Sequence, residues 1–190
     1  ECTDNLNRAC PDLANCAGDT GILLSQISDN GVVFETKKNY AKDMVTAFIR
    51  LNGATVGAVA NRSEIYGTDG TLEETFDGTL SAKGAKKAAA FVKFCDAFGI
   101  PVLTITNVKG FKATKCSEKF MAQNVAELTY AFADATVPKV NVVVGQAYGS
   151  AYLAMNSKSI GADMVFAWPN AEIGMMDAKA AAKIMYADED

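Results

Sequence analysis

Residues 139–157 read KVNVVVGQAYGSAYLAMNS, and this stretch combines a strand, a glycine-rich turn and the start of a helix. The β-branched run at 139–145 predicts a buried strand. Gly145 and Gly149 predict a tight turn, and a short helix is expected to begin near Ser150. The first amides of a helix have no acceptor within the helix. The turn therefore directs N–H donors out of the carboxyl edge of a sheet, which suits an anion or a developing oxyanion.

The segments on either side of this turn alternate between helix and strand. Hydrophobic spacing, capping residues and prolines give the element boundaries. Strands that are separated by helices imply parallel pairing through right-handed crossovers, so the fold class is α/β with a single domain. The expected elements are a helix capped by Ser81 and ending near Phe98, a strand at 101–107, a helix capped by Ser117 and ended by Pro138, a strand at 163–167, a turn at 168–170 and a helix opening at Asp177.

The first part of the chain carries a different pattern. Residues 1–43 predict a helical lead-in, with two short helices that are broken at Gly18. Residues 44–60 hold two β-rich runs around Asn52-Gly53, which predicts a hairpin because a type I′ turn needs positive φ at both central positions. Residues 61–79 contain three glycines and many polar side chains and are interpreted as a long loop. The core is therefore expected at 44–187.

Composition excludes several classes of function. The chain has 190 residues, of which 49% are hydrophobic and 21% charged, as in ordinary globular proteins. It contains no histidine, which excludes a Ser-His-Asp or Cys-His nucleophile system and a His-ligated metal within this chain. No metal site is expected. The net charge of -4 argues against nucleic-acid binding, for which a basic patch supplies most of the affinity.

The cysteines and the first residues suggest a cellular setting. Five cysteines, an odd number without a C-x-x-C pair, indicate reduced thiols in a cytoplasmic protein. A Cys10–Cys16 disulfide is the less favoured alternative. The chain opens Glu-Cys-Thr-Asp, without the charged and apolar regions of a signal peptide. Because no methionine starts it, we expect a piece of a longer subunit.

Each candidate site residue also has a purely structural interpretation. The two glycines of the turn can serve backbone geometry alone. Ser150 lies outside a G-x-S-x-G elbow and has no histidine to activate it, which disfavours a hydrolase. Spaced lysines in a polar loop are usually solvated, and carboxylates near a helix start usually serve the helix dipole. Cys116 is expected to be an ordinary thiol. The lysines and carboxylates in question are Lys109, Lys112, Lys115, Glu172 and Asp177.

Two long runs resemble one protein family. AAAFVKFCDAFGIPVLTITNVKGF at 88–111 and YAFADATVPKVNVVVGQAYGSAYLAMNSKSIGADMVFAWPNAEIGMM at 130–176 are similar to the carboxyltransferase subunits of biotin-dependent acyl-CoA carboxylases and decarboxylases. The resemblance covers roughly residues 45–187, and a weaker one extends before that. Propionyl-CoA carboxylase β chains and the α subunits of methylmalonyl-CoA and glutaconyl-CoA decarboxylases are in this family.

The resemblance implies a fold and a role for the turn. The family has two successive crotonase-like (ClpP/crotonase) lobes, and these motifs belong to the second, carboxyl-terminal lobe, so the whole chain 1–190 is expected to be that single lobe. In the family the second lobe holds biotin, which a separate carrier domain delivers, and amides of a Tyr-Gly-Gly-Ala turn bind the ureido oxygen. Carried over, the donors are the amides of Ser150 and Ala151 beside Gly149. The resemblance also places Gly110, Phe111, Ile173 and Gly174 at the biotin site.

The family's active site implies partners as well. The first lobe binds the acyl-CoA, and the site forms where lobes of two subunits meet, so a homo-oligomer is expected. The biotin carboxyl carrier protein is a second partner, and a decarboxylase adds a membrane pump subunit. The isolated chain is expected to be inactive. Carboxyl transfer in this family proceeds through two enolates that backbone amides stabilise, so it needs no imidazole, which agrees with the absence of histidine.

The sequence departs from the family at two places. Ser150 replaces the second glycine of the turn, so a Cβ narrows the approach to its amide. The family's Asp-Val-Pro-Gly-Phe-Leu-Pro-Gly loop is here Asn107-Val-Lys-Gly-Phe-Lys-Ala-Thr114, and the loss of both prolines is expected to loosen it. A non-catalytic crotonase-like lobe that only holds subunits together is the alternative function. The direction of carboxyl transfer and the acyl group are left open by these residues.

Overall fold

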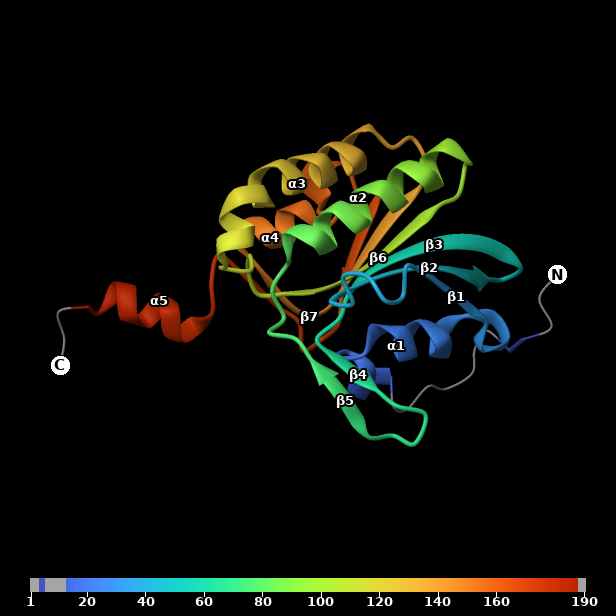
Figure 1. Ribbon diagram of the computed structural model, residues 1–190, viewed down its shortest axis with the longest axis horizontal. Helices are drawn as coiled ribbons and strands as arrows, with labels where there is room; N and C mark the ends of the chain where they lie inside the picture. The colour runs from blue at the N-terminus through green and yellow to red at the C-terminus, as the bar shows by residue number, and fades with distance from the viewer. Residues whose placement is uncertain (1–3, 6–12, 188–190) are drawn as a thin grey trace.

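The computed structural model describes residues 4–5 and 13–187, which form an α/β unit around one large sheet. From α2 to β8 its strands and helices occur in the order that the α/β pattern predicts (Figure 1). The α-helices are α1 (Thr20–Ile27), α2 (Ala82–Ala97), α3 (Lys115–Asp134), α4 (Gly149–Ala154) and α5 (Ala178–Met185). The strands are β1 (Val33–Thr36), β2 (Met44–Leu51), β3 (Ala54–Asn61), β4 (Glu64–Tyr66), β5 (Leu72–Thr75), β6 (Val102–Val108), β7 (Lys139–Tyr148), β8 (Met164–Ala167) and β9 (Glu172–Gly174). Short 3-10 helices span Leu13–Cys16, Asp29–Gly31 and Lys158–Ile160.

The large sheet has the order β1-β2-β3-β6-β7-β8, and β9 also pairs with β7. The pairs β3–β6, β6–β7 and β7–β8 are parallel, as the alternation of helix and strand predicts. Helices α2, α3 and α4 cover one face and α1 covers the other (Figure 1). The carboxyl ends of β3, β6 and β7 therefore lie along one edge of the sheet.

Two buried clusters hold these layers together. The first lies between the sheet and α2, α3 and α4, and the alanines of α2 allow that helix to approach both the sheet and α3 closely. Phe132 and Leu128 of α3 are fully buried in it. The second cluster lies under α1 and includes Leu23 and Leu24 together with alternate residues of β2 and β3. Both faces of the central strands are covered, which is the usual situation in a parallel sheet.

Local signals account for several of these elements. Asn52 and Gly53 adopt φ of 51° and 80° between β2 and β3, which confirms the predicted type I′ hairpin. The Ser81 hydroxyl accepts a hydrogen bond from the Gly84 amide at 2.9 Å, which confirms the cap of α2. The cap of α3 was predicted three residues too late. Thr114 is the cap, and its hydroxyl accepts from the Ser117 amide at 3.1 Å.

Two further expectations were wrong. The lead-in at 1–43 is not only helical, because β1 pairs with β2 and so joins the sheet. The segment 61–79 is not a structureless loop, since β4 and β5 form an antiparallel hairpin whose turn is closed by the Gly67 amide donating to the Thr71 carbonyl. Strands of three and four residues are too short to show period-2 patterning. Most of the first short helix expected before Gly18, and Cys10 of the alternative disulfide, lie outside the described residues.

The last helix differs from the others in its packing. Asp177 caps α5 as predicted, and its carboxylate accepts from the Ala180 amide at 3.0 Å. None of the residues of α5 is buried, and Figure 1 shows the helix projecting from the body of the molecule. No helix within the described residues is long and apolar enough to cross a membrane.

Candidate functional site

Asn107 organises the carboxyl edge of the parallel strands. Its backbone amide donates to the Asn61 side-chain oxygen at 3.2 Å, which ties the end of β6 to the end of β3. Its side-chain oxygen accepts from the Gln146 amide of β7 at 3.0 Å, and its side-chain nitrogen donates to the Ala17 carbonyl at 3.2 Å. Asn107 therefore joins the end of β6 to β3 through its backbone, and to β7 and Ala17 through its side chain.

Gly145 lies inside β7 rather than in a turn, which corrects the prediction for that glycine. A Cβ at this position would lie 2.5 Å from Oδ1 of Asn107, so the glycine provides the space that the Asn107 side chain occupies. The pairing of β6 with β7 shifts here, from Thr106 opposite Val143 to Val108 opposite Ala147. Because of this bulge, β7 continues to Tyr148 instead of ending at residue 145.

The turn that joins β7 to α4 is formed by a single left-handed residue. Gly149 has φ of 59°, and a Cβ there would lie 3.1 Å from the Met175 carbonyl oxygen. Helix α4 begins at this residue, and Tyr148 at its N-cap position makes no side-chain capping hydrogen bond among the described residues. Ser150 is exposed, whereas Ala151 is 1% exposed. Backbone N–H groups in this position can serve an acceptor from outside the chain.

A strand that sequence patterns did not predict lies beside this turn. After the predicted turn at 168–170, β9 pairs with the carboxyl-terminal end of β7. Ile173 lies opposite Ala147, and Gly174 lies opposite Tyr148. Ile173 is 55% exposed. Two of the residues that the resemblance assigned to the site thus pair with the two residues that precede Gly149. The sequence signal for this strand is weak, because β9 has only three residues.

The Gly110-Phe111 segment is bound to a different element. The Gly110 carbonyl accepts from the Leu80 amide at 2.8 Å, and the Leu80 carbonyl accepts from the Lys112 amide at 3.0 Å. These bonds hold the loop after β6 against Leu80, two residues before α2. The loop begins beside the end of β7, because Val108 pairs with Ala147.

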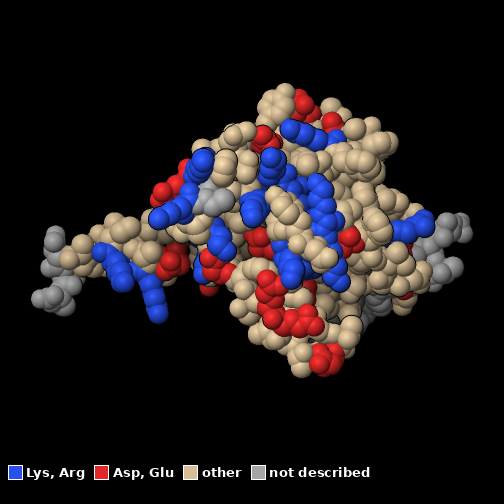
Figure 2. Space-filling model, in the orientation of Figure 1, with Lys and Arg blue, Asp and Glu red and all other residues tan. Residues whose placement is uncertain are grey.

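Helix α2 also carries a buried lysine, Lys87. Lys87 is 2% exposed, and its Nζ donates to the carbonyls of Tyr40 at 2.8 Å and Met44 at 2.7 Å. The pKa of Lys87 is lowered from 10.5 to about 8, mainly by burial, and this net value includes an opposing effect of nearby carboxylates and a smaller lowering by the positive charges of Arg62 and Lys37. Figure 2 shows Lys and Arg side chains gathered over α2 and the loop before β2.

The lowered pKa of Lys87 gives a predicted pH dependence of stability. Between about pH 8 and 10.5 the unfolded chain holds a proton on this side chain that the folded chain has released, so the free energy of unfolding rises with pH. One proton contributes at most about 1.4 kcal/mol per pH unit. Burial raises the pKa of Cys95 to about 12, and this works in the opposite direction from about pH 9 upward in every variant. Relative to Lys87→Met, the free energy of unfolding of the natural chain and of Lys86→Met, which changes an exposed lysine, should therefore rise between pH 7.5, 8.5 and 9.5 in denaturant unfolding. Parallel curves for all three proteins would contradict the assignment.

Comparison with known proteins now identifies the family. The carboxyl transferase domain model matches residues 1–190. The propionyl-CoA carboxylase beta chain of Cereibacter sphaeroides is 41% identical over 187 residues, which are 98% of this chain and 35% of that protein. The methylmalonyl-CoA decarboxylase subunit alpha of Propionigenium modestum is 38% identical over 193 residues, covering 97% of this chain and 35% of that protein. The chain spans about a third of the length of these curated relatives.

Solved structures agree with the sequence relatives. A transcarboxylase 12S crystal structure, described as a hexamer assembly with methylmalonyl-coenzyme A bound, superposes with a TM-score of 0.80 at 40% identity over 90% of this chain and 31% of that one. The beta subunit of geranyl-CoA carboxylase from P. aeruginosa gives a TM-score of 0.73 at 26% identity over 85% of this chain and 29% of that one. The expected crotonase-like fold is thereby confirmed. With its glycine turn at the carboxyl edge of a crotonase-like sheet, this chain belongs to the carboxyl transferase domain family.

Proposed function

We propose that this chain is the biotin-binding lobe of an acyl-CoA carboxyltransferase, and that the amides of Ser150 and Ala151 donate to the ureido oxygen of biotin. The observation that carries the proposal is the left-handed Gly149, which lies between the end of β7 and the first turn of α4. Donors that are fixed before the reaction stabilise negative charge as it develops on an oxygen, without further reorganisation of the site.

The residues around the turn fit biotin in both its polar and its apolar part. The backbone of Gly149–Ala151 is proposed to supply donors, and the exposed side chain of Ile173, which lies opposite Ala147, is proposed to supply apolar surface. Gly110, Phe111 and Gly174 are proposed to line the same site. Biotin supplies the nitrogen that carries the carboxyl group between partners.

The reaction proposed for the assembled enzyme is carboxyl transfer between biotin on a carrier domain and the α-carbon of an acyl-CoA. The acyl-CoA is proposed to bind mainly through another lobe, and further carboxyltransferase subunits and the biotin carboxyl carrier protein are the proposed partners. The relatives include carboxylases and decarboxylases, which share this transfer step. The odd cysteine count supports a reducing, cytoplasmic setting.

The test is the carboxylation of free biotin with malonyl-, methylmalonyl- or glutaconyl-CoA as donor. We expect activity from an assembled carboxyltransferase that contains this sequence together with an acyl-CoA-binding lobe. We expect none from the 190-residue chain alone, because holding both reactants in one site can supply a large part of the rate enhancement. Activity of the isolated chain would contradict the division of the site between lobes. An inactive assembly of correct size would favour the scaffold function instead.

A further inference from the structure

Strand β9 is attached to the molecule by very few groups. All three of its residues are exposed, and the helix that follows it, α5, has no buried residue. Within residues 4–5 and 13–187, the only strand pairing of its backbone is with residues 146–148 of β7. A short exposed strand of this kind is at the low end of local stability. Any side-chain contact to β9 therefore contributes strongly to fixing the positions of Ile173 and Gly174.

Tyr148 and Glu172 make such a contact. Glu172 lies opposite Gln146 in the register, and Tyr148 is two residues further along β7 on the same face, so the two side chains are diagonal neighbours. The Tyr148 hydroxyl donates a hydrogen bond to the Glu172 carboxylate. The Tyr148 side chain is largely buried, with 6% of the residue exposed, so it is held against the protein rather than directed to a ligand.

This hydrogen bond joins β9 to the turn itself. Tyr148 is the residue immediately before Gly149, and the Met175 carbonyl, which follows β9, lies close to Gly149 on the other side. The hydrogen bond to Glu172 raises the pKa of Tyr148 above 10.0, so the hydroxyl keeps its proton and remains a donor at neutral and mildly alkaline pH. The contact is therefore present over the pH range in which such an enzyme would be assayed.

We propose that Tyr148 and Glu172 act as a positioning pair, which holds the amide turn Gly149–Ala151 and the segment Ile173–Gly174 in one fixed arrangement. Neither side chain touches biotin in this scheme. The inference rests on the proposed function of the turn and adds two residues to it. A displacement of β9 moves both walls of the site, so loss of the pair should weaken the use of biotin and leave acyl-CoA binding unchanged.

The experiment uses the assembled carboxyltransferase with free biotin as acceptor. Tyr148→Phe and Glu172→Ala should each lower kcat/KM for biotin about tenfold or more, the effect of losing one hydrogen bond to a charged group. The double variant should be no worse than the poorer single variant, because both changes remove the same bond. Glu172→Gln should keep most activity, since its amide oxygen still accepts from the tyrosine. KM for the acyl-CoA should stay the same throughout.

A control variant and the pattern of losses distinguish failure of the positioning pair from failure of the proposed function. Glu73→Ala removes an exposed carboxylate from the β4–β5 hairpin and should behave as the natural enzyme does. The proposed pair would be wrong if the losses in kcat/KM for biotin of the two single variants multiply in the double variant. It would also be wrong if Tyr148→Phe and Glu172→Ala keep the kcat/KM of the natural enzyme. If Gly149→Val is also fully active, the proposed function of the turn fails. If Gly149→Val is inactive while Tyr148→Phe is normal, only the positioning pair fails.

Discussion

Gly149→Val should lower the turnover of the assembled carboxyltransferase by at least about 100-fold, the cost of losing one oxyanion donor. Gly149 has φ of 59°, which a β-branched residue adopts only with strain, and its Cβ would meet the Met175 carbonyl at 3.1 Å. Relief of this contact moves the turn, and the amides of Ser150 and Ala151 move with it. The affinity for acyl-CoA, measured separately, should change little because another lobe is proposed to hold that substrate.

Two further variants make this result specific. Gly70→Val introduces the same side chain at φ of 78°, where no atom lies within 4 Å of the Cβ, so it reproduces the backbone strain away from the turn and should retain turnover. Ser150→Gly should keep most activity, because the backbone and not the hydroxyl does the proposed work. If Ser150→Gly abolishes turnover while Gly149→Val leaves it intact, the amide mechanism is wrong.

Local sequence signals predicted the elements whose boundaries are set by neighbours in the chain. Asn52-Gly53 and Ser81 are examples, because a turn or a cap depends on a few adjacent residues. The α3 cap was misplaced because Thr114 and Ser117 are both good cap residues, and in the structure Ser117 supplies the amide that Thr114 caps. Strand β9 was missed because three residues give too short a pattern for a strand.

The site was predicted in part, and what was missed depends on contacts between distant residues. The resemblance indicated Gly149, Ser150 and Ala151, which are consecutive at the start of α4, and their role in binding biotin stays a prediction. Gly145 was misinterpreted because its role is to leave space for Asn107, a residue of another strand. Glu172 meets Tyr148 only through the parallel register of β9 with β7, across 24 residues. Periodicity within one segment contains no information on such a register.

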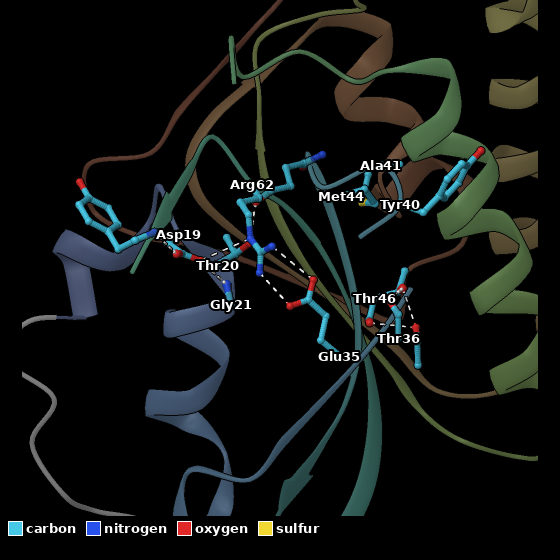
Figure 3. A network of polar contacts seen from close by, with 12 residues as sticks. Asp19, Thr20, Gly21, Glu35, Thr36, Tyr40, Ala41, Met44, Thr46 and Arg62 are labelled. Atoms are coloured by element: carbon cyan, nitrogen blue, oxygen red, sulfur yellow. Dashed lines mark hydrogen bonds and ion pairs between the residues drawn. The ribbon is translucent and has the colours of Figure 1, made fainter. Parts of the chain in front are cut away.

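Arg62 is a second feature that depends on distant residues, and it lies in the stretch that was interpreted as a loop. Its guanidinium contacts the Glu35 carboxylate through two hydrogen bonds of 3.2 and 3.3 Å, and its Nε lies 3.4 Å from the Asp19 carboxylate (Figure 3). The side chain is 5% exposed. Asp19 also caps α1 by accepting from the Gly21 amide. The arginine therefore connects α1, β1 and the end of β3.

Arg62→Met should lower the free energy of unfolding by about 3–5 kcal/mol, because it removes the cation from the buried Asp19 carboxylate and from the mostly buried Glu35 carboxylate. For a chain of this length the corresponding fall in Tm is on the order of 10 °C. Thermal and denaturant unfolding of the 190-residue chain measure both quantities. Arg62→Lys should be intermediate, since an ammonium group cannot form the two-pronged contact with Glu35 and reach Asp19 at the same time.

Lys42→Met is the matched control, because it removes a cation of the same charge from an ion pair that is exposed. The Lys42 Nζ lies 2.7 Å from the Glu74 carboxylate, yet the two side chains are 41% and 42% exposed. Water and salt screen such a pair, so its loss should cost about 1 kcal/mol or less. The contrast follows from burial rather than from distance, since the shorter of the two contacts is the weaker. Equal losses in Arg62→Met and Lys42→Met would show that burial of the carboxylates does not set the energy of the Arg62 cluster.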